Sequence, residues 1–217
     1  LAGIFGNTIT TWDDPKIKEL NPDAALPSAS IAQFHRSDAS GTTDNFTKYL
    51  IAASGGAWTF PGGKDWSAPG GQGSKGSDGV TSSVKSTANS IGYVELSYAQ
   101  SAGLTMASID NGGGAVAPSS DAAAKTISSA ELTGSGNDLA LSIDYATQEA
   151  GAYPIVLVTY EITCEKGGDA ATLDLTKSFL TYVVSDEGQR KLTELGYVPI
   201  AGELIGKVRA AVSAISA

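Results

Sequence analysis

The clearest pattern along the chain is a short apolar run, then a turn, then an amphipathic helix. Residues 30–34 have the apolar character of a buried strand. The following helix face consists of apolar residues spaced three and four apart, namely Phe46, Tyr49, Leu50 and Ala53. Thr42 or Thr43 is the expected N-cap, and Gly55-Gly56 ends the helix. The pattern predicts strand, tight turn and helix between residues 30 and 56.

Similar signals alternate along the rest of the chain. The expected strands cover residues 91–94, 105–109 and the β-branched and aromatic stretch 153–162. The expected helices cover residues 15–21 (capped by Asp13 or Asp14), 78–87, 95–102, a segment opening at 118–121, 173–184 and 187–195. A last helix is expected to bury Leu204, Val208, Ala211, Val212 and Ile215. Residues 55–79, rich in Gly, Pro, Lys and Ser, are expected to form a long ordered excursion.

Alternating strands and helices predict an α/β fold with a mostly parallel sheet. The length of 217 residues suits one large domain or two modest ones, and no apolar run approaches the ~20 residues that cross a bilayer. The net charge of −9 argues against nucleic acid as a partner, since such proteins carry a basic surface. In the helix at 173–184, one apolar face is expected to consist of Leu175, Phe179, Leu180 and Val183.

Candidate chemistry gathers at the turn before the first amphipathic helix. Arg36 supplies a charged planar fork, Ser40 and Thr42 supply hydroxyls, and Gly41 lets a ligand approach the backbone. Asp38 is close enough to pair with Arg36 and fix its direction. A helix N-terminus adds unpaired N–H groups and partial positive charge, so this turn suits an oxyanion. The alternative is an ordinary capped helix beside a surface Arg–Asp pair.

Other chemistry is weakly supported. The only histidine, His35, is expected on the strand face opposite Arg36, and there is no Gly-x-Ser-x-Gly element of a serine hydrolase. Asp13-Asp14 fits a helix cap better than a calcium site, and no cofactor or metal is expected. Trp58 and Trp66 are expected to pack. The single cysteine, Cys164, is expected either to be a buried thiol or to pair with a cysteine outside this chain.

Residues 36–42 resemble the Arg-x-Asp-Gly-Ser-Gly-Thr segment of phosphate-binding proteins that serve high-affinity phosphate ABC importers. Residues 4–15, 20–22, 73–80, 91–95 and 151–155 resemble further segments of that family in the same order, closest to its actinobacterial members. Ala39 departs from the family pattern, which often has Gly there. The resemblance covers essentially the whole chain.

This resemblance implies a periplasmic-binding-protein-like fold in which two α/β lobes close over phosphate. It implies that Arg36, Ser40, Gly41 and Thr42 touch the ion and that Asp38 braces Arg36. Residues 1–148 would form most of the second lobe, and 149–217 would return to the first. Family members carry an N-terminal segment before the Ile4-Phe5-Gly6 element, so the first lobe is expected to be incomplete here and to expose apolar faces.

The function so implied is an extracytoplasmic receptor, not an enzyme, that hands phosphate to a membrane permease and is anchored, if at all, by lipid at a missing N-terminus. Two alternatives stay open: a secreted α/β hydrolase or phosphatase, and a receptor for another oxyanion such as sulfate or molybdate.

Overall fold

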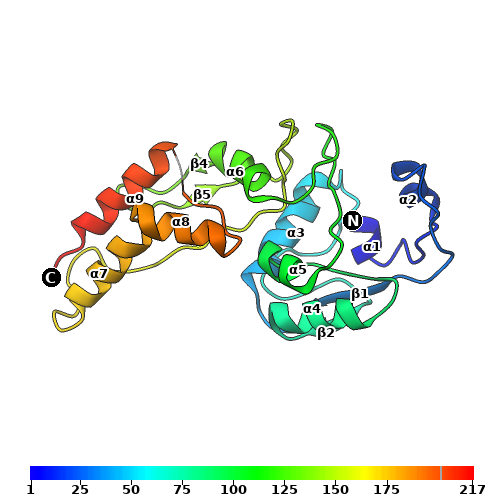
Figure 1. The fold of residues 1–217 in the computed structure, drawn as a ribbon, viewed down its shortest axis with the longest axis horizontal. Helices are drawn as coiled ribbons and strands as arrows, with labels where there is room; N and C mark the ends of the chain where they lie inside the picture. Colours follow the sequence, from blue (N-terminus) through cyan, green and yellow to red (C-terminus); the bar gives the residue numbers. More distant parts are fainter. Residues whose placement is uncertain (201) are drawn as a thin grey trace. The chain divides into compact units, whose positions relative to one another are not determined.

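The computed structural model describes residues 1–200 and 202–217, which divide into two compact units, Leu1–Ala107 and Ser108–Ala217 (Figure 1). Each unit is described by itself below. The expected lobe boundary near residue 148 stays a prediction, because compactness alone does not show where a chain crosses between lobes.

Unit 1 is built on a three-stranded parallel sheet with the order β2-β1-β3. Its strands are β1 (Ala32–Arg36), β2 (Gln72–Ser74) and β3 (Ser90–Gly92). Phe34 of the central strand lies opposite Gln72 on one side and Gly92 on the other. The expected parallel sheet is therefore present, with β1 starting two residues later than its apolar run.

The helices of unit 1 are α1 (Ala2–Phe5), α2 (Pro15–Leu20), α3 (Gly41–Ala53), α4 (Gly76–Ser86) and α5 (Leu96–Ala102). Helix α4 packs on all three strands and on α5 (Figure 1). Its Val80 is fully buried against Gly92. A Cβ at Gly92 would come within 2.9 Å of Val80 Cγ1 and of Val84 Cγ2, so the glycine permits this close helix–strand approach.

Aromatic rings fill the core between the sheet and α3. Phe46 of α3 stacks on Tyr93 with ring centroids 4.5 Å apart and meets Phe5 edge-on at 4.9 Å. Trp66 meets Tyr93 at 5.8 Å and Trp58 at 5.6 Å, so the excursion that carries both tryptophans packs into the core as expected.

Unit 2 is mainly helical. It contains α6 (Ser120–Ser128), the antiparallel pair β4 (Glu131–Leu132) and β5 (Leu141–Ser142), and then α7 (Leu173–Val183), α8 (Asp186–Glu194) and α9 (Gly202–Ala214) (Figure 1). Helices α7 and α9 share a core of Leu180, Val184, Val212 and Ile215, against which Leu173, Ile205 and Val208 are partly buried.

Two expected strands are wrong. Residues 153–162 form no strand in the described structure, although their composition favours one. Of the 105–109 stretch, only Ile109 pairs, in an isolated bridge with Val116. A strand exists through the ladder to its neighbour, and residues 155–162 make no backbone hydrogen bond to any described residue.

Leu180 of α7 is buried, whereas Leu175 and Phe179 of the same helix are 73% and 56% exposed. Burial differs from expectation at two other places. In the last helix only Val212 is buried; Ile215, just beyond its end, is buried as well, whereas Leu204 and Ala211 are half-buried. Cys164 is a free and exposed thiol, not a buried one.

None of the described helices combines the length and the apolar character needed to span a membrane.

Candidate anion-binding site

The carboxyl ends of the three parallel strands lie at one edge of the sheet, where ligands bind in open α/β sheets. Asp38 follows β1, Gly76 begins α4 after β2, and Tyr93 follows β3. Hydrogen bonds connect these three loops to one another. The Gly76 N–H donates to Asp38 Oδ1 at 3.0 Å, and the Arg36 N–H donates to Tyr93 Oη at 3.2 Å.

Arg36 and Asp38 form a two-pronged ion pair at this edge. Arg36 Nε donates to Asp38 Oδ1 at 2.9 Å, and Nη2 donates to Oδ2 at 2.6 Å. The Arg36 side chain is 13% exposed, so the fork is held in a largely buried position. Hydrogen bonds from the Arg36 side chain, and then from the Gly76 N–H, hold the pKa of Asp38 well below its ordinary value.

The pair fixes the direction of the guanidinium. A carboxylate that takes both Nε and Nη2 leaves Nη1 as the outward prong of the planar fork. Among the described residues, no partner of Nη1 is found. The hydrogen bonds that Arg36 donates to the Asp38 carboxylate also raise the pKa of Arg36, so the side chain stays charged throughout the physiological range. The expected bracing of Arg36 by Asp38 thus has a direct geometric form.

Ser40, not Thr42 or Thr43, is the N-cap of α3, which corrects the expectation from the sequence. Its Oγ accepts from the Thr42 N–H at 3.1 Å and the Thr43 N–H at 3.4 Å. Ser40 has extended backbone angles (φ −146°, ψ 133°), which the hydroxyl of a capping residue needs to reach back to these N–H groups.

This cap changes which donors are available. A hydroxyl has two acceptor lone pairs and one proton, and both lone pairs of Ser40 Oγ are in use. Its proton therefore remains for a further acceptor. The N–H of Gly41 and the hydroxyl of Thr42 have no hydrogen-bond partner within residues 1–200 and 202–217. Together with the positive end of the α3 dipole, these groups make a compact set of donors.

Tyr93 joins the two halves of the site, a role that the sequence did not indicate. Its hydroxyl accepts from the Arg36 N–H and lies 2.8 Å from Thr43 Oγ1, which is fully buried. The end of β1 is thereby tied to the first turn of α3. Burial raises the pKa of Tyr93, so its hydroxyl keeps the proton with which it can donate to Thr43. The available signal was its position just past a neighbouring parallel strand.

His35 takes no part in the donor set. Its ring stacks on Trp66 at 5.0 Å between centroids and 11° between planes, and its Nδ1 lies 3.0 Å from the Arg36 carbonyl oxygen. These contacts give the histidine a structural role.

The family model described as PBP superfamily domain matches residues 1–187. The phosphate-binding protein PstS 3 of Mycobacterium tuberculosis is 44% identical over 220 residues, which covers all of this chain and 59% of that protein. PstS 3 of Mycobacterium leprae is 42% identical, and PstS of Xylella fastidiosa is 38% identical over 97% of this chain and 57% of that protein. This chain thus spans less than two thirds of the length of these relatives.

Solved structures with the same fold include a high-affinity periplasmic phosphate-binding protein (PfluDING) bound with phosphate. It matches at a TM-score of 0.69 and 21% sequence identity, and the match covers 96% of this chain and 63% of that one. A human phosphate-binding apolipoprotein matches at a TM-score of 0.64 and 19% identity, over 96% of this chain and 64% of that one. At such low identity the likeness concerns the fold alone. With a family model that covers most of its residues and a fold that agrees, the chain belongs to the PBP superfamily.

Proposed function

We propose that the chain binds inorganic phosphate at the turn between β1 and α3, as part of an extracytoplasmic solute-binding protein. Arg36, Ser40, Gly41 and Thr42 hold the ion, and Asp38 supports Arg36. The observation that carries the proposal is the Arg36–Asp38 fork beside a capped helix N-terminus, where the Gly41 N–H and the Thr42 hydroxyl have no partner among the described residues. The naming of the mycobacterial relatives as phosphate-binding proteins supports the same assignment.

The chemistry of the site favours binding through many hydrogen bonds over binding through net charge. Asp38 neutralises the charge of Arg36, and the chain as a whole has a net charge of −9. Exposed charges farther away than the Debye length of about 8 Å are largely screened at physiological salt. Fixed N–H and O–H donors at contact distance are not, so they hold the anion in an acidic protein.

Isothermal titration calorimetry with phosphate tests the site. Arg36→Ala is expected to weaken affinity at least tenfold, because it removes the only cationic prong in the donor set. Arg36→Lys keeps a charge without the planar fork and is expected to fall in between. Arg190→Ala is the matched control, because Arg190 is an exposed arginine of unit 2. Unchanged affinity in Arg36→Ala would reject the assignment.

The identity of the anion is tested by competition. Sulfate and molybdate are added against phosphate, and displacement at equal concentration would favour a general oxyanion receptor. A chromogenic phosphate ester tests the hydrolase alternative. Turnover of the ester that is lost in Ser40→Ala would support that alternative. In the described residues, His35 stacks on Trp66 and its Nδ1 lies by the Arg36 carbonyl oxygen, so no hydrogen bond of its Nδ1 reaches Ser40.

The role of the whole protein follows from the proposed ligand. Closure of two lobes around phosphate would deliver the ion to the permease of an ABC importer on the outer side of the membrane. Lipid anchoring and completion of the first lobe by a further N-terminal segment belong to the same proposal. Because that segment would bring further donors, this chain alone is expected to bind phosphate weakly. A submicromolar dissociation constant for the 217-residue chain would contradict that part.

A further inference from the structure

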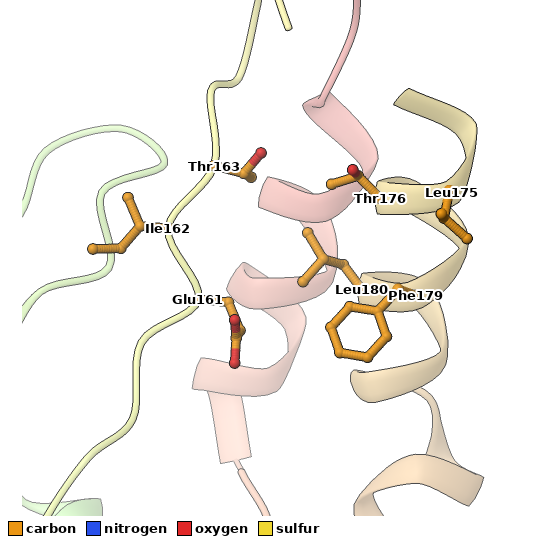
Figure 2. A pocket seen from close by; sticks show the side chains of 7 residues that line it. All are labelled: Glu161, Ile162, Thr163, Leu175, Thr176, Phe179 and Leu180. Atoms are coloured by element: carbon orange, nitrogen blue, oxygen red, sulfur yellow. The ribbon is translucent and has the colours of Figure 1, made fainter. Parts of the chain in front are cut away.

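A hollow of about 390 Å³ lies in unit 2, lined by Leu175 and Phe179 of α7 and by the extended residues 161–163 (Figure 2). All of these residues fall within 149–217, the part expected to return to the first lobe. Completion of that lobe already belongs to the proposed function, so the hollow offers no separate site. Unit 1 holds a feature that the proposed function leaves without a role, the backbone of Gly76.

The turn between β2 and α4 has a conformation that depends on glycine. Lys75 has φ −79° and ψ 127°, and Gly76 has φ +68°. These angles resemble those of a type II turn, which requires a positive φ at its second central residue. Its first central ψ differs by about 150° from that of a type I turn, so the peptide that carries the Gly76 N–H faces the opposite way. A Cβ on Gly76 would meet no heavy atom of another segment within 4 Å, so only the backbone angle calls for glycine.

This turn holds the loop after β1 at two points. The Gly76 N–H donates to Asp38 Oδ1 at 3.0 Å, and the Ser37 N–H donates to the Ser74 carbonyl oxygen at 3.0 Å. The same Asp38 carboxylate takes the Nε and Nη2 prongs of Arg36. Gly76 therefore connects the ion pair to the start of α4.

The contact also stabilises the charge of Asp38. Lys75, the N-cap residue of α4, supplies no side-chain cap, so the Asp38 carboxylate lies at the positive end of this 11-residue helix. The Gly76 N–H lowers the pKa of Asp38, second only to the side chain of Arg36. A carboxylate fixed in this way keeps its oxygens on Nε and Nη2, which leaves Nη1 directed outward to an anion.

We propose that Gly76 is a positioning residue of the anion site: its left-handed backbone orients the N–H that fixes Asp38 and, through Asp38, the direction of Arg36. Gly76 acts through Asp38 and contacts no ion itself. The proposal rests on the proposed function, because it assigns a share of the affinity for phosphate to a residue outside the donor set.

The test compares two glycines with nearly the same backbone angle. Gly103 has φ +66° at the end of α5, and a Cβ there would also meet no heavy atom of another segment within 4 Å. Its N–H donates to the Gln100 carbonyl oxygen instead of to Asp38. A β-branched residue is strained at this angle, so Gly76→Val and Gly103→Val should cost similar stability in urea unfolding. Gly76→Asn adopts the angle more readily and should restore most of what Gly76→Val loses.

Two measurements on the 217-residue chain decide the role of Gly76. NMR follows the exchange of the Arg36 Nε–H with water in the absence of phosphate, and calorimetry measures the affinity for inorganic phosphate. Gly76→Val is expected to speed the exchange and to weaken the affinity, each by about threefold or more, because a hydrogen bond to a charged group is lost. Gly103→Val is expected to change neither.

Equal results for the two valine variants in both measurements would overturn the proposal. Where valine prevents folding, Gly76→Ala and Gly103→Ala give the same comparison with a smaller side chain. A chain that binds no phosphate would reject the proposed function, whereas the exchange of the Arg36 Nε–H would still decide whether Gly76 positions the fork. Phosphate binding that is equally strong in all variants would leave the anion site in place and overturn only the role of Gly76.

Discussion

The hydroxyl of Tyr93 offers the sharpest test of how the candidate site is held together. In Tyr93→Phe, the ring and its stacking on Phe46 remain, whereas the Arg36 N–H and Thr43 Oγ1 each lose a partner. A polar group left unsatisfied in the interior costs about 1–3 kcal/mol. Thr43 is fully buried and Arg36 partly so, and we expect unfolding free energy to fall by about 2 kcal/mol.

A variant of Thr43, the residue at the other end of this hydrogen bond, gives a second test of the expected loss of stability. In Thr43→Val the Tyr93 hydroxyl still accepts from the Arg36 N–H, so we expect a loss of about 1 kcal/mol. The double variant leaves only the Arg36 N–H unpaired, so its loss should be about 1 kcal/mol, less than the sum of the single losses. The coupling energy between the two hydroxyls should therefore be about 2 kcal/mol.

Urea unfolding followed by tryptophan fluorescence measures these values. All three tryptophans (Trp12, Trp58 and Trp66) lie in unit 1, so the signal reports on the unit that contains the site. Tyr98→Phe is the control, because no hydrogen bond of the Tyr98 hydroxyl is found in the described part of the chain. A loss below about 0.5 kcal/mol in Tyr93→Phe, or additive effects in the cycle, would refute the bridging role.

Three further predictions concern the same unit. Hydrogen bonds from Arg36 depress the pKa of Asp38. The contribution of this ion pair to the unfolding free energy should therefore be complete above about pH 4 and should be lost only as the pH falls through the lowered pKa of the folded state. An NMR titration of the Asp38 carboxyl with a midpoint near 3.9 would contradict this. Ser40→Ala removes the cap of α3 and should lower the unfolding free energy, measured by urea unfolding, by about 1 kcal/mol. Ser40→Thr should retain most of the capping free energy, and equal losses in the two variants would count against the cap. Gly92→Ala should cost about 1–3 kcal/mol in the same assay because the new methyl overlaps Val80, and a neutral result would show that α4 shifts freely.

Local signals in the sequence predicted much of unit 1. Helix α2 begins after Asp14, whose side chain accepts from the Lys16 N–H, as its sequence indicated. The strand, turn and helix appear in the expected order: β1 starts two residues after its expected start, and α3 ends just before the expected Gly55-Gly56 stop. Helix hydrogen bonds and caps connect residues within four positions of one another, so the sequence pattern contains their partners. The Arg36–Asp38 pair was predictable for the same reason, since two residues separate its members.

Contacts between distant residues were not predictable in this way. The expected cap of α3, Thr42 or Thr43, lies two or three residues after the observed cap, Ser40. All three residue positions carry hydroxyls that suit an N-cap, and only the backbone angles select Ser40. Tyr93 reaches Thr43, fifty positions earlier, through the arrangement of parallel strands. Nothing within either segment indicates that contact.

The sequence by itself determined where helices begin, where charge and hydroxyls gather at residues 36–42, and which stretches have strand composition. Only the tertiary structure decided which donors remain free at that turn, that Tyr93 joins β1 to α3, and that residues 153–162 form no strand. The physical reason is that a helix closes its hydrogen bonds within one segment, whereas a strand or a binding site is completed by groups that another part of the chain must bring.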